Sequence, residues 1–332
     1  MCAHQAMVHP SVAFLKETCV QSHRIPSSLI DASEPACADF SGLWVPLVTP
    51  FRDGAVDHPA LATLVRQLAR SGIAGFVVCG STGEAAALDD DEQLAVFATV
   101  ADAAPALPRI MGIGGSHLGQ TLAWVRRLAA LRPAGLLVPA PSYIRPSQAG
   151  LTDWFRTIAD ISPAPVLLYD IPYRTGSTLA LDTLLTLASH PNIRAVKDCG
   201  GDATKTRALI ADGRLQVLAG EDAQMFSLLA EGGSGAIAAS AHLQPARFVR
   251  LIGLLADGRM AEARAEWQSL APLIGLLFAE PNPAPVKALL ALDGTMSAEL
   301  RAPMTAASAA LTERLRAVQD TLAAPRDVLS RR

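Results

Sequence analysis

The sequence predicts an α/β protein built on a (β/α)8 TIM barrel with a C-terminal helical appendage. From Gly42 onward, short apolar runs recur along the chain, and an amphipathic stretch follows each of them. The runs are continuously apolar, which favours a parallel sheet covered by helices over half-exposed antiparallel strands. Eight such units match the size of a (β/α)8 barrel, whereas a doubly wound sheet, the alternative, more naturally stops at five or six strands.

Each predicted strand is a short run of apolar or β-branched residues. In chain order these runs are 43–48, 75–78, 109–112, 135–138, 166–168, 193–196, 215–219 and 235–238. The helical patterns between and after them are 59–70, 90–103, 118–131, 148–161, 181–189, 204–211, 223–231 and 245–256. Beyond Asp257 the strand signal ends and three helical patterns continue to about Leu322. We therefore expect an irregular extension over 1–39, the barrel over 40–257 and a helical region over 258–332.

Composition and charge narrow the class of protein. The chain has 332 residues, of which 50% are apolar, and a formal net charge of −3, which suits a large buried core. No basic run indicates a nucleic acid or membrane partner, and no apolar stretch is long enough to span a bilayer. The five cysteines form no disulfide framework and no signal peptide is visible, so we expect a cytoplasmic protein.

Several common catalytic motifs are missing from the sequence. The seven histidines show neither HExxH nor Cys/His ligand spacing, so we expect no metal site. The glycines of 112–119 do not form a dinucleotide fingerprint, because His117 stands where the third glycine is needed. No Gly-x-Ser-x-Gly segment with a downstream histidine supports a serine hydrolase.

The ends of the predicted strands hold the candidate catalytic residues, because a barrel carries its chemistry at that face. Lys197 closes an apolar strand, and partial desolvation there makes the neutral, nucleophilic form of a lysine accessible. Its alternative role is structural, as the partner of Asp198 or another carboxylate. All three tyrosines follow consecutive strands, and among them Tyr169 and Tyr143 are candidate proton donors and acceptors. The alternative for the tyrosines is packing at the barrel rim.

Two further segments offer binding groups. Residues 80–84 place two hydroxyls, Ser81 and Thr82, between glycines that let an anion approach the backbone. No Gly-Lys-Ser/Thr follows, so this segment is not a Walker phosphate loop. Arg174 would bind a carboxylate in bidentate fashion if it faces the cavity, and otherwise would form a salt bridge at the rim.

Taken together, these segments resemble the dihydrodipicolinate synthase/N-acetylneuraminate lyase family over about residues 40–320. The matching segments, in order, are Leu47-Val-Thr-Pro-Phe51, Gly80-Ser-Thr-Gly-Glu84, Tyr143 with Arg145-Pro-Ser-Gln148, Tyr169-Asp-Ile-Pro172, Arg174-Thr-Gly176, Lys197, Gly220-Glu-Asp222, Gly232-Gly-Ser-Gly-Ala-Ile237 and Asn282-Pro-Ala-Pro-Val-Lys287. The resemblance implies a class I lyase that uses pyruvate and an aldehyde acceptor, with no metal and no organic cofactor.

The resemblance also implies a role for each matched residue. Lys197 would form a Schiff base with pyruvate, and Tyr169 would be the general acid and base. Ser81, Tyr169 and Tyr143 would form a proton relay, with Tyr143 reaching in from a neighbouring subunit of a homotetramer or homodimer. The residues expected to complete the site are Thr82, as a ligand of the pyruvate carboxylate, together with Gly220 and Ile237 in its wall.

Within the family, Arg174 favours the synthase branch, where the arginine holds the carboxylate of aspartate semialdehyde. Three departures from the family pattern keep other acceptors open: Ser142 replaces an aromatic residue, Ile144 replaces an Asn and Asp170 replaces an Asn. The alternatives are a sibling aldolase or dehydratase, such as a neuraminate lyase-like or sugar-acid aldolase, and a non-catalytic barrel used for binding. The intact set of site residues argues against the last.

The resemblance bears on regulation as well. Lysine-inhibited members bind lysine at a tight-dimer interface through polar and aromatic groups. At the matching positions this chain has Thr121 in place of a carboxylate and Ser142 in place of an aromatic side chain, and Asp90 could replace the missing charge only in part. We therefore expect L-lysine to leave the rate unchanged.

Overall fold

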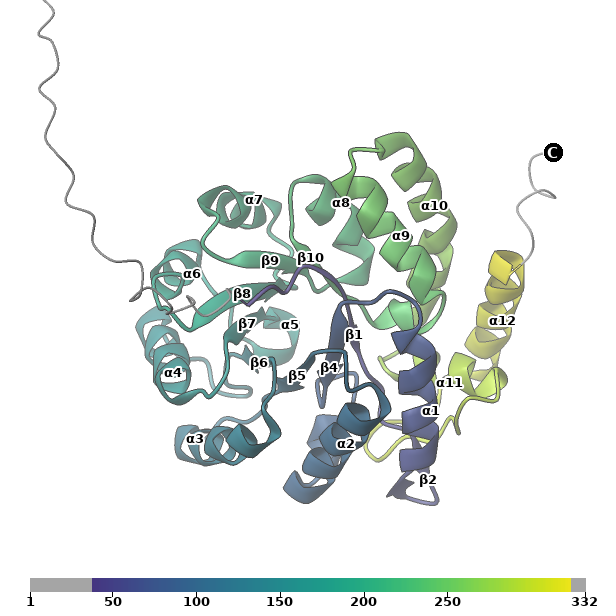
Figure 1. Cartoon of the computed structure of the whole chain (residues 1–332), viewed down its shortest axis with the longest axis horizontal. Helices are drawn as coiled ribbons and strands as arrows, with labels where there is room; N and C mark the ends of the chain where they lie inside the picture. The colour runs from purple at the N-terminus through teal and green to yellow at the C-terminus, as the bar shows by residue number, and fades with distance from the viewer. Residues whose placement is uncertain (1–37, 324–332) are drawn as a thin grey trace, which may run out of the picture. The chain divides into compact units, whose positions relative to one another are not determined.

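Eight parallel strands close into a barrel in the computed structural model, which describes residues 38–323 (Figure 1). The strands are β1 (Gly42–Pro46), β4 (Gly75–Val78), β5 (Arg109–Gly112), β6 (Gly135–Pro139), β7 (Val166–Asp170), β8 (Ile193–Asp198), β9 (Gln216–Ala219) and β10 (Gly235–Ile237). Their order around the barrel follows the chain, and β10 pairs with β1 to close it. The predicted fold class is confirmed. Nearly all of the predicted extension over 1–39 lies outside the described residues.

The predicted strands differ from the observed ones mainly at their carboxyl ends. Strands β4 and β5 have the predicted bounds, whereas β7 and β8 each run two residues further than predicted, to Asp170 and Asp198. The added residues are polar, so an apolar run alone could not reveal them. As a result, Tyr169 and Lys197 lie inside hydrogen-bonded strands rather than at their very ends. A short hairpin, β2 (Phe51–Arg52) with β3 (Ala55–Val56), was not predicted.

Helices surround the barrel and alternate with its strands (Figure 1). They are α1 (His58–Ala69), α2 (Asp90–Ala103), α3 (Leu118–Arg127), α4 (Gln148–Ile161), the short α5 (Pro172–Thr175), α6 (Leu181–Leu187), α7 (Ala203–Asp212), α8 (Met225–Ala230) and α9 (Pro245–Ala256). The helix predicted over 118–131 ends earlier than expected, because its last turn tightens into a 3-10 helix at Leu128–Leu131. Three further helices, α10 (Met260–Leu277), α11 (Ala284–Leu292) and α12 (Ala309–Ala323), follow the barrel.

Aromatic side chains fill the end of the barrel opposite the candidate site. The rings of Phe40 and Trp44 lie 5.9 Å apart, and the indole N–H of Trp44 donates to the Phe40 carbonyl. Gly75 makes room for this packing, because a Cβ there would collide with the Trp44 ring and would lie 2.5 Å from the Pro108 carbonyl oxygen. The barrel is thus a packed core that is closed at this end.

Ion pairs bond the region after residue 257 to the barrel. Lys287 of α11 forms an ion pair with Glu84, in the loop after β4, and donates to the Glu299 carbonyl at 2.9 Å. Arg301 pairs with Glu92 at the start of α2. The C-terminal region therefore reaches the loop that carries Ser81 and Thr82. The division of the chain at residue 257 stays a prediction.

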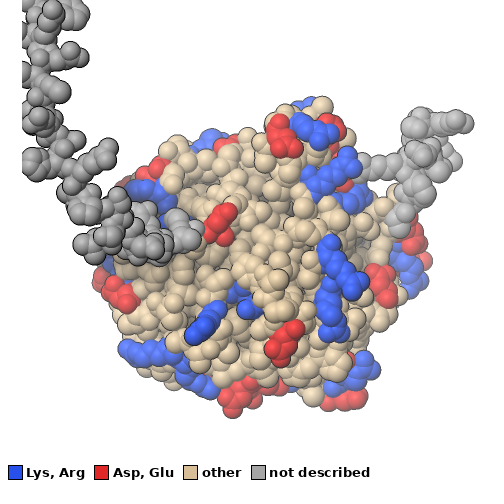
Figure 2. Space-filling view, viewed as in Figure 1, with Lys and Arg blue, Asp and Glu red and all other residues tan. Residues whose placement is uncertain are grey.

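The surface carries no long stretch of one charge on the face shown in Figure 2, where basic and acidic side chains are interspersed. Within residues 38–323, no helix combines the length and the apolar character that a membrane crossing needs. No group of three or more His, Cys, Asp or Glu side chains in this part of the chain could hold a metal ion.

His242 is buried where β10 leads into α9, and both of its ring nitrogens are used. The backbone N–H of Val48 donates to Nε2 at 3.1 Å, and Nδ1 lies 2.8 Å from the Ala239 carbonyl, to which it donates. This pattern requires the neutral imidazole, since Nε2 must accept. Burial lowers the pKa of His242 to about 4.

Acidification should destabilise the fold through this histidine. Because its folded-state pKa lies below the unfolded value of about 6.5, the stabilisation is complete above pH 6.5 and is lost as the pH falls toward 4, by up to about 3 kcal/mol. Urea unfolding between pH 7 and pH 4 would measure this. We expect His242→Gln to be less stable at pH 7 and to show a flatter pH dependence than the wild type. Equal slopes in the two proteins would contradict the assignment.

Candidate active site

Lys197 and Tyr169 lie level with each other on neighbouring strands at the carboxyl end of the barrel. They are paired in the register of β8 and β7, and the Lys197 Nζ lies 3.4 Å from the Tyr169 hydroxyl oxygen and 4.5 Å from the ring centroid. Both side chains are buried, at 5% and 7% exposure. Asp198 points the other way, so its carboxylate accepts from Gly200 N and Thr206 Oγ1 rather than from the amine. The alternative of a Lys197–Asp198 pair is therefore wrong.

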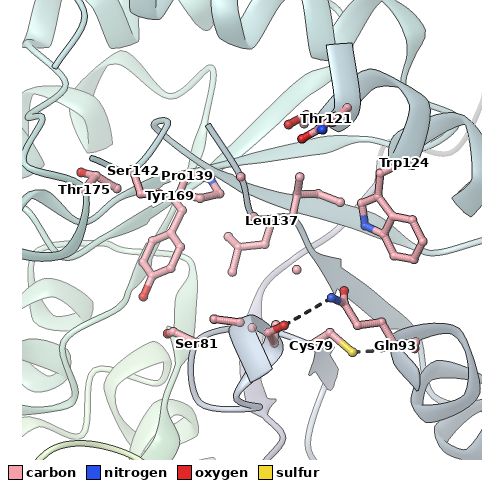
Figure 3. Close-up of a pocket in the computed structure, with 18 of the residues that line it drawn as sticks. Cys79, Ser81, Gln93, Thr121, Trp124, Leu137, Pro139, Ser142, Tyr169 and Thr175 are labelled. Atoms are coloured by element: carbon pink, nitrogen blue, oxygen red, sulfur yellow. Dashed lines mark hydrogen bonds between the residues drawn. The ribbon is translucent and has the colours of Figure 1, made fainter. Parts of the chain in front are cut away.

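The Tyr169 phenol is held in its protonated form. Burial raises its pKa well above 10, and the nearby Cys199 adds to the effect, while a hydrogen bond with Ser81 and the charge of Arg174 oppose it. Figure 3 shows the Tyr169 ring with its hydroxyl directed toward Ser81. The structure thus brings together the amine, the phenol and the Ser81 hydroxyl, in an order that lets a proton pass between them.

Thr82 is fixed by a residue that the sequence indicated only as part of a motif. Its buried hydroxyl oxygen accepts a hydrogen bond of 2.9 Å from the Asn282 side-chain amide, which precedes α11. Since the oxygen accepts this bond, the hydroxyl hydrogen is free to point into the cavity. Asn282 and Thr82 are 200 residues apart, so spacing along the chain could not have revealed the contact.

A small cavity of about 20 Å³ lies at the amine of Lys197. The predicted residues in its wall are Ser81, Thr82, Tyr169, Arg174, Lys197, Gly220 and Ile237, and Asn282 joins them. Gly220 is required here because a Cβ would lie 2.8 Å from Cγ and 2.9 Å from Cε of Lys197 and would collide with the Cys199 sulfur. The absence of a side chain at Gly220 leaves room for the aliphatic part of Lys197. Seven of the eight predicted site residues therefore meet at one point.

Arg174 lies at the mouth of this cavity, on α5. No Asp or Glu among residues 38–323 forms an ion pair with it, so the predicted alternative of a rim salt bridge is not observed. Its guanidinium lies 5.7 Å from the ring centroid of Tyr173, whose hydroxyl donates to Glu221 at 2.8 Å. The guanidinium is thus available to a carboxylate that enters from solvent.

Tyr143 is the predicted site residue that lies elsewhere. It is 97% exposed, has a φ of +71° and lines neither the small cavity nor the larger one beside it. Within one chain, therefore, it does not meet Tyr169. Its role in a second copy of the chain stays a prediction.

A larger cavity of about 750 Å³ opens beside Tyr169 and shares Ser81 and Arg174 with the smaller one. In Figure 3 it extends from Tyr169 to Trp124 on the opposite side. The three residues expected to matter for lysine binding, Asp90, Thr121 and Ser142, all line it, together with Ala85, Gln93 and His117. Asp90 is the one acidic residue in the described wall, and its carboxylate is paired with Arg127 at 2.7 Å.

The fold and the site define a (β/α)8 barrel with a buried lysine and tyrosine at its catalytic end. The sequence model of the Dihydrodipicolinate synthetase family matches residues 39–322, and the chain belongs to this family. The 4-hydroxy-tetrahydrodipicolinate synthase of Haloarcula marismortui is 37% identical over 288 residues, which are 86% of this chain and 94% of that protein. The predicted family and enzyme class, a lyase, are thereby confirmed.

Solved structures of the same family agree closely with this fold. The chloride-inhibited dihydrodipicolinate synthase of Acinetobacter baumannii, solved with pyruvate, has a TM-score of 0.82 and 31% identity and covers 84% of this chain and 98% of its own. The enzyme of Cyanidioschyzon merolae, solved with lysine bound, has a TM-score of 0.82 and 30% identity over 85% of this chain and 97% of its own.

L-Lysine at millimolar concentration should leave the rate of this enzyme unchanged. An added ammonium needs a free carboxylate, but Asp90 already pairs with Arg127, and Thr121 brings no charge. Steady-state rates across a lysine titration test this, with calorimetry to detect binding that does not inhibit. Strong, saturable inhibition would contradict the expectation.

Proposed function

We propose that this protein is a 4-hydroxy-tetrahydrodipicolinate synthase, which condenses pyruvate with L-aspartate 4-semialdehyde. The observation that carries the proposal is the Lys197 amine, which is buried beside the Tyr169 phenol at the carboxyl end of the barrel strands and forms no ion pair with a carboxylate of residues 38–323. Such an amine suits Schiff-base chemistry with a carbonyl substrate. The relatives that bear this name cover most of the chain.

In the proposed mechanism, the neutral Lys197 amine attacks C2 of pyruvate to give a carbinolamine, which loses water to form a protonated imine. The imine accepts the electron pair released when C3 loses a proton, and the resulting enamine attacks the aldehyde carbon of the acceptor. The amine of the acceptor then closes the ring on C2 and releases Lys197. Tyr169 donates and accepts the protons of these steps, which its protonated resting state and its bond to Ser81 support.

Two groups bind the substrate carboxylates in this proposal. The Thr82 hydroxyl, turned toward the cavity by Asn282, donates to the carboxylate of pyruvate. Arg174 at the mouth binds the carboxylate of the semialdehyde, which suits its freedom from ion pairs with described residues. The carboxylate of each substrate thereby has its own hydrogen-bond donor. The positions of the two donors fix the order of the two carbonyl carbons along the cavity.

The proposal extends to assembly and location. A homotetramer or homodimer, in which Tyr143 of one copy reaches Tyr169 of another, is supported by the near-complete exposure of Tyr143 and by its left-handed backbone conformation. A non-glycine residue in that conformation is uncommon and suggests a functional constraint. We place the enzyme in the cytoplasm, with small-molecule substrates as its partners.

Trapping with borohydride tests the Schiff base directly. Pyruvate plus borohydride should add one reduced pyruvyl group to the protein. Peptide mapping should find it at Lys197 and not at the other two lysines of the described residues, because Lys205 and Lys287 are held in buried ion pairs. Lys197→Ala should lose both the label and nearly all turnover. Lys197→Arg should fare no better, since a guanidinium stays protonated and cannot attack a carbonyl. A label that persists in Lys197→Ala would refute the assignment.

Arg174→Leu tests the identity of the acceptor. The variant should still form the Schiff base, while its KM for the semialdehyde should rise about ten- to a hundredfold, the value of a charged hydrogen bond. Initial rates at varied semialdehyde and saturating pyruvate give this KM. Arg214→Leu, which loses an exposed pair with Asp212, is the matched control and should keep the wild-type KM. If Arg174→Leu also keeps it, the acceptor is not bound through this arginine.

A further inference from the structure

An aspartate directly follows each of the two central catalytic residues, and both aspartates point away from the cavity. Asp170 follows Tyr169 and Asp198 follows Lys197, with exposures of 1% and 5%. Successive residues of a strand face opposite sides, so the inward tyrosine and lysine require outward neighbours. The two buried carboxylates therefore lie between the barrel and its helices, where each needs a partner.

The first turns of α7 supply both partners. Lys205 forms an ion pair with Asp170 and also donates to the Leu179 carbonyl at 3.1 Å. Thr206 donates its hydroxyl to Asp198. One helix thus anchors the carboxyl ends of β7 and β8, the two strands that carry the phenol and the amine.

The anchor is itself fixed in place. Asp202 caps α7 by accepting from the Lys205 backbone N–H at 3.1 Å. Gly200 packs closely between the strands and the helix. A Cβ at this position would lie 2.7 Å from Asp170 Oδ2 and 2.8 Å from Lys205 Nζ. The backbone of Asp170 is also bonded to the next strand, since Cys199 N donates to its carbonyl at 2.9 Å. Little room remains for Asp170 to shift while the pair is intact.

We propose that Lys205, acting through Asp170, is a positioning residue that holds the Tyr169 phenol in reach of the Lys197 amine and of Ser81. This inference rests on the proposed function, since it concerns the proton transfers assigned to Tyr169. A displacement of about 1 Å at reacting groups can cost on the order of a hundredfold in rate. Losing the pair therefore affects kcat more than the binding of pyruvate, because neither Asp170 nor Lys205 lines the small cavity.

The test combines Lys205→Met with a double-mutant cycle. Lys205→Met should lower kcat about ten- to a hundredfold while the pyruvate KM stays within about threefold of wild type. In a Tyr169→Phe background, which has already lost the phenol, the same change should lower kcat by no more than about threefold. Arg247→Met, which removes one of the arginine partners of buried Glu266 away from the site, is the control for general damage and should lower Tm without this pattern.

A second variant separates positioning from stability. The double substitution Asp170→Asn/Lys205→Met removes both charges, so Tm should recover toward wild type while kcat stays low. Recovery of kcat together with Tm, or equal effects of Lys205→Met with and without the phenol, would overturn the proposal. Borohydride trapping of pyruvate by the wild-type protein is run alongside. If the wild type forms no Schiff base, the proposed function fails, and if it does, the cycle tests Lys205 alone.

Discussion

The parallel register of β7 and β8 is the constraint on which the site depends. It places Tyr169 level with Lys197, and the alternation of side chains along each strand turns both groups into the barrel. The same alternation turns a carboxylate from each strand outward into a buried layer. The residues inside the barrel and the ion pair outside it are therefore carried by the same two paired strands. A shift of either strand would displace both.

The loop after β4 depends on a different part of the chain. Glu84 pairs with Lys287 of α11, and Thr82 accepts from Asn282, so residues about 200 positions further along hold the loop that carries Ser81. Removing one partner of a buried ion pair costs about 3–5 kcal/mol, because the other charge stays buried without compensation. The C-terminal helices thus stabilise the site as well as cover the barrel.

Most of the fold could be predicted from the sequence because buried parallel strands are continuously apolar. This pattern can be recognised without knowing which residues are in contact. The prediction was incomplete where polar residues extend a strand, as at Asp170 and Asp198. In the site, residues at strand ends could be found from position alone. Asn282 and Lys205 could not be assigned roles, because their partners Thr82 and Asp170 are 200 and 35 residues away in the chain. Only the closed barrel brings them together.

The distribution of lysines explains why one amine is singled out for chemistry. The chain has four lysines, and the three within the described residues are all buried. Lys287 and Lys205 each form an ion pair with a carboxylate, which occupies the nitrogen. Lys197 instead faces the protonated Tyr169 phenol, and no carboxylate of residues 38–323 forms an ion pair with it. Among the described lysines, only Lys197 is buried without an ion pair and lines the small cavity, so its nitrogen is the one that we expect to be open to a carbonyl substrate.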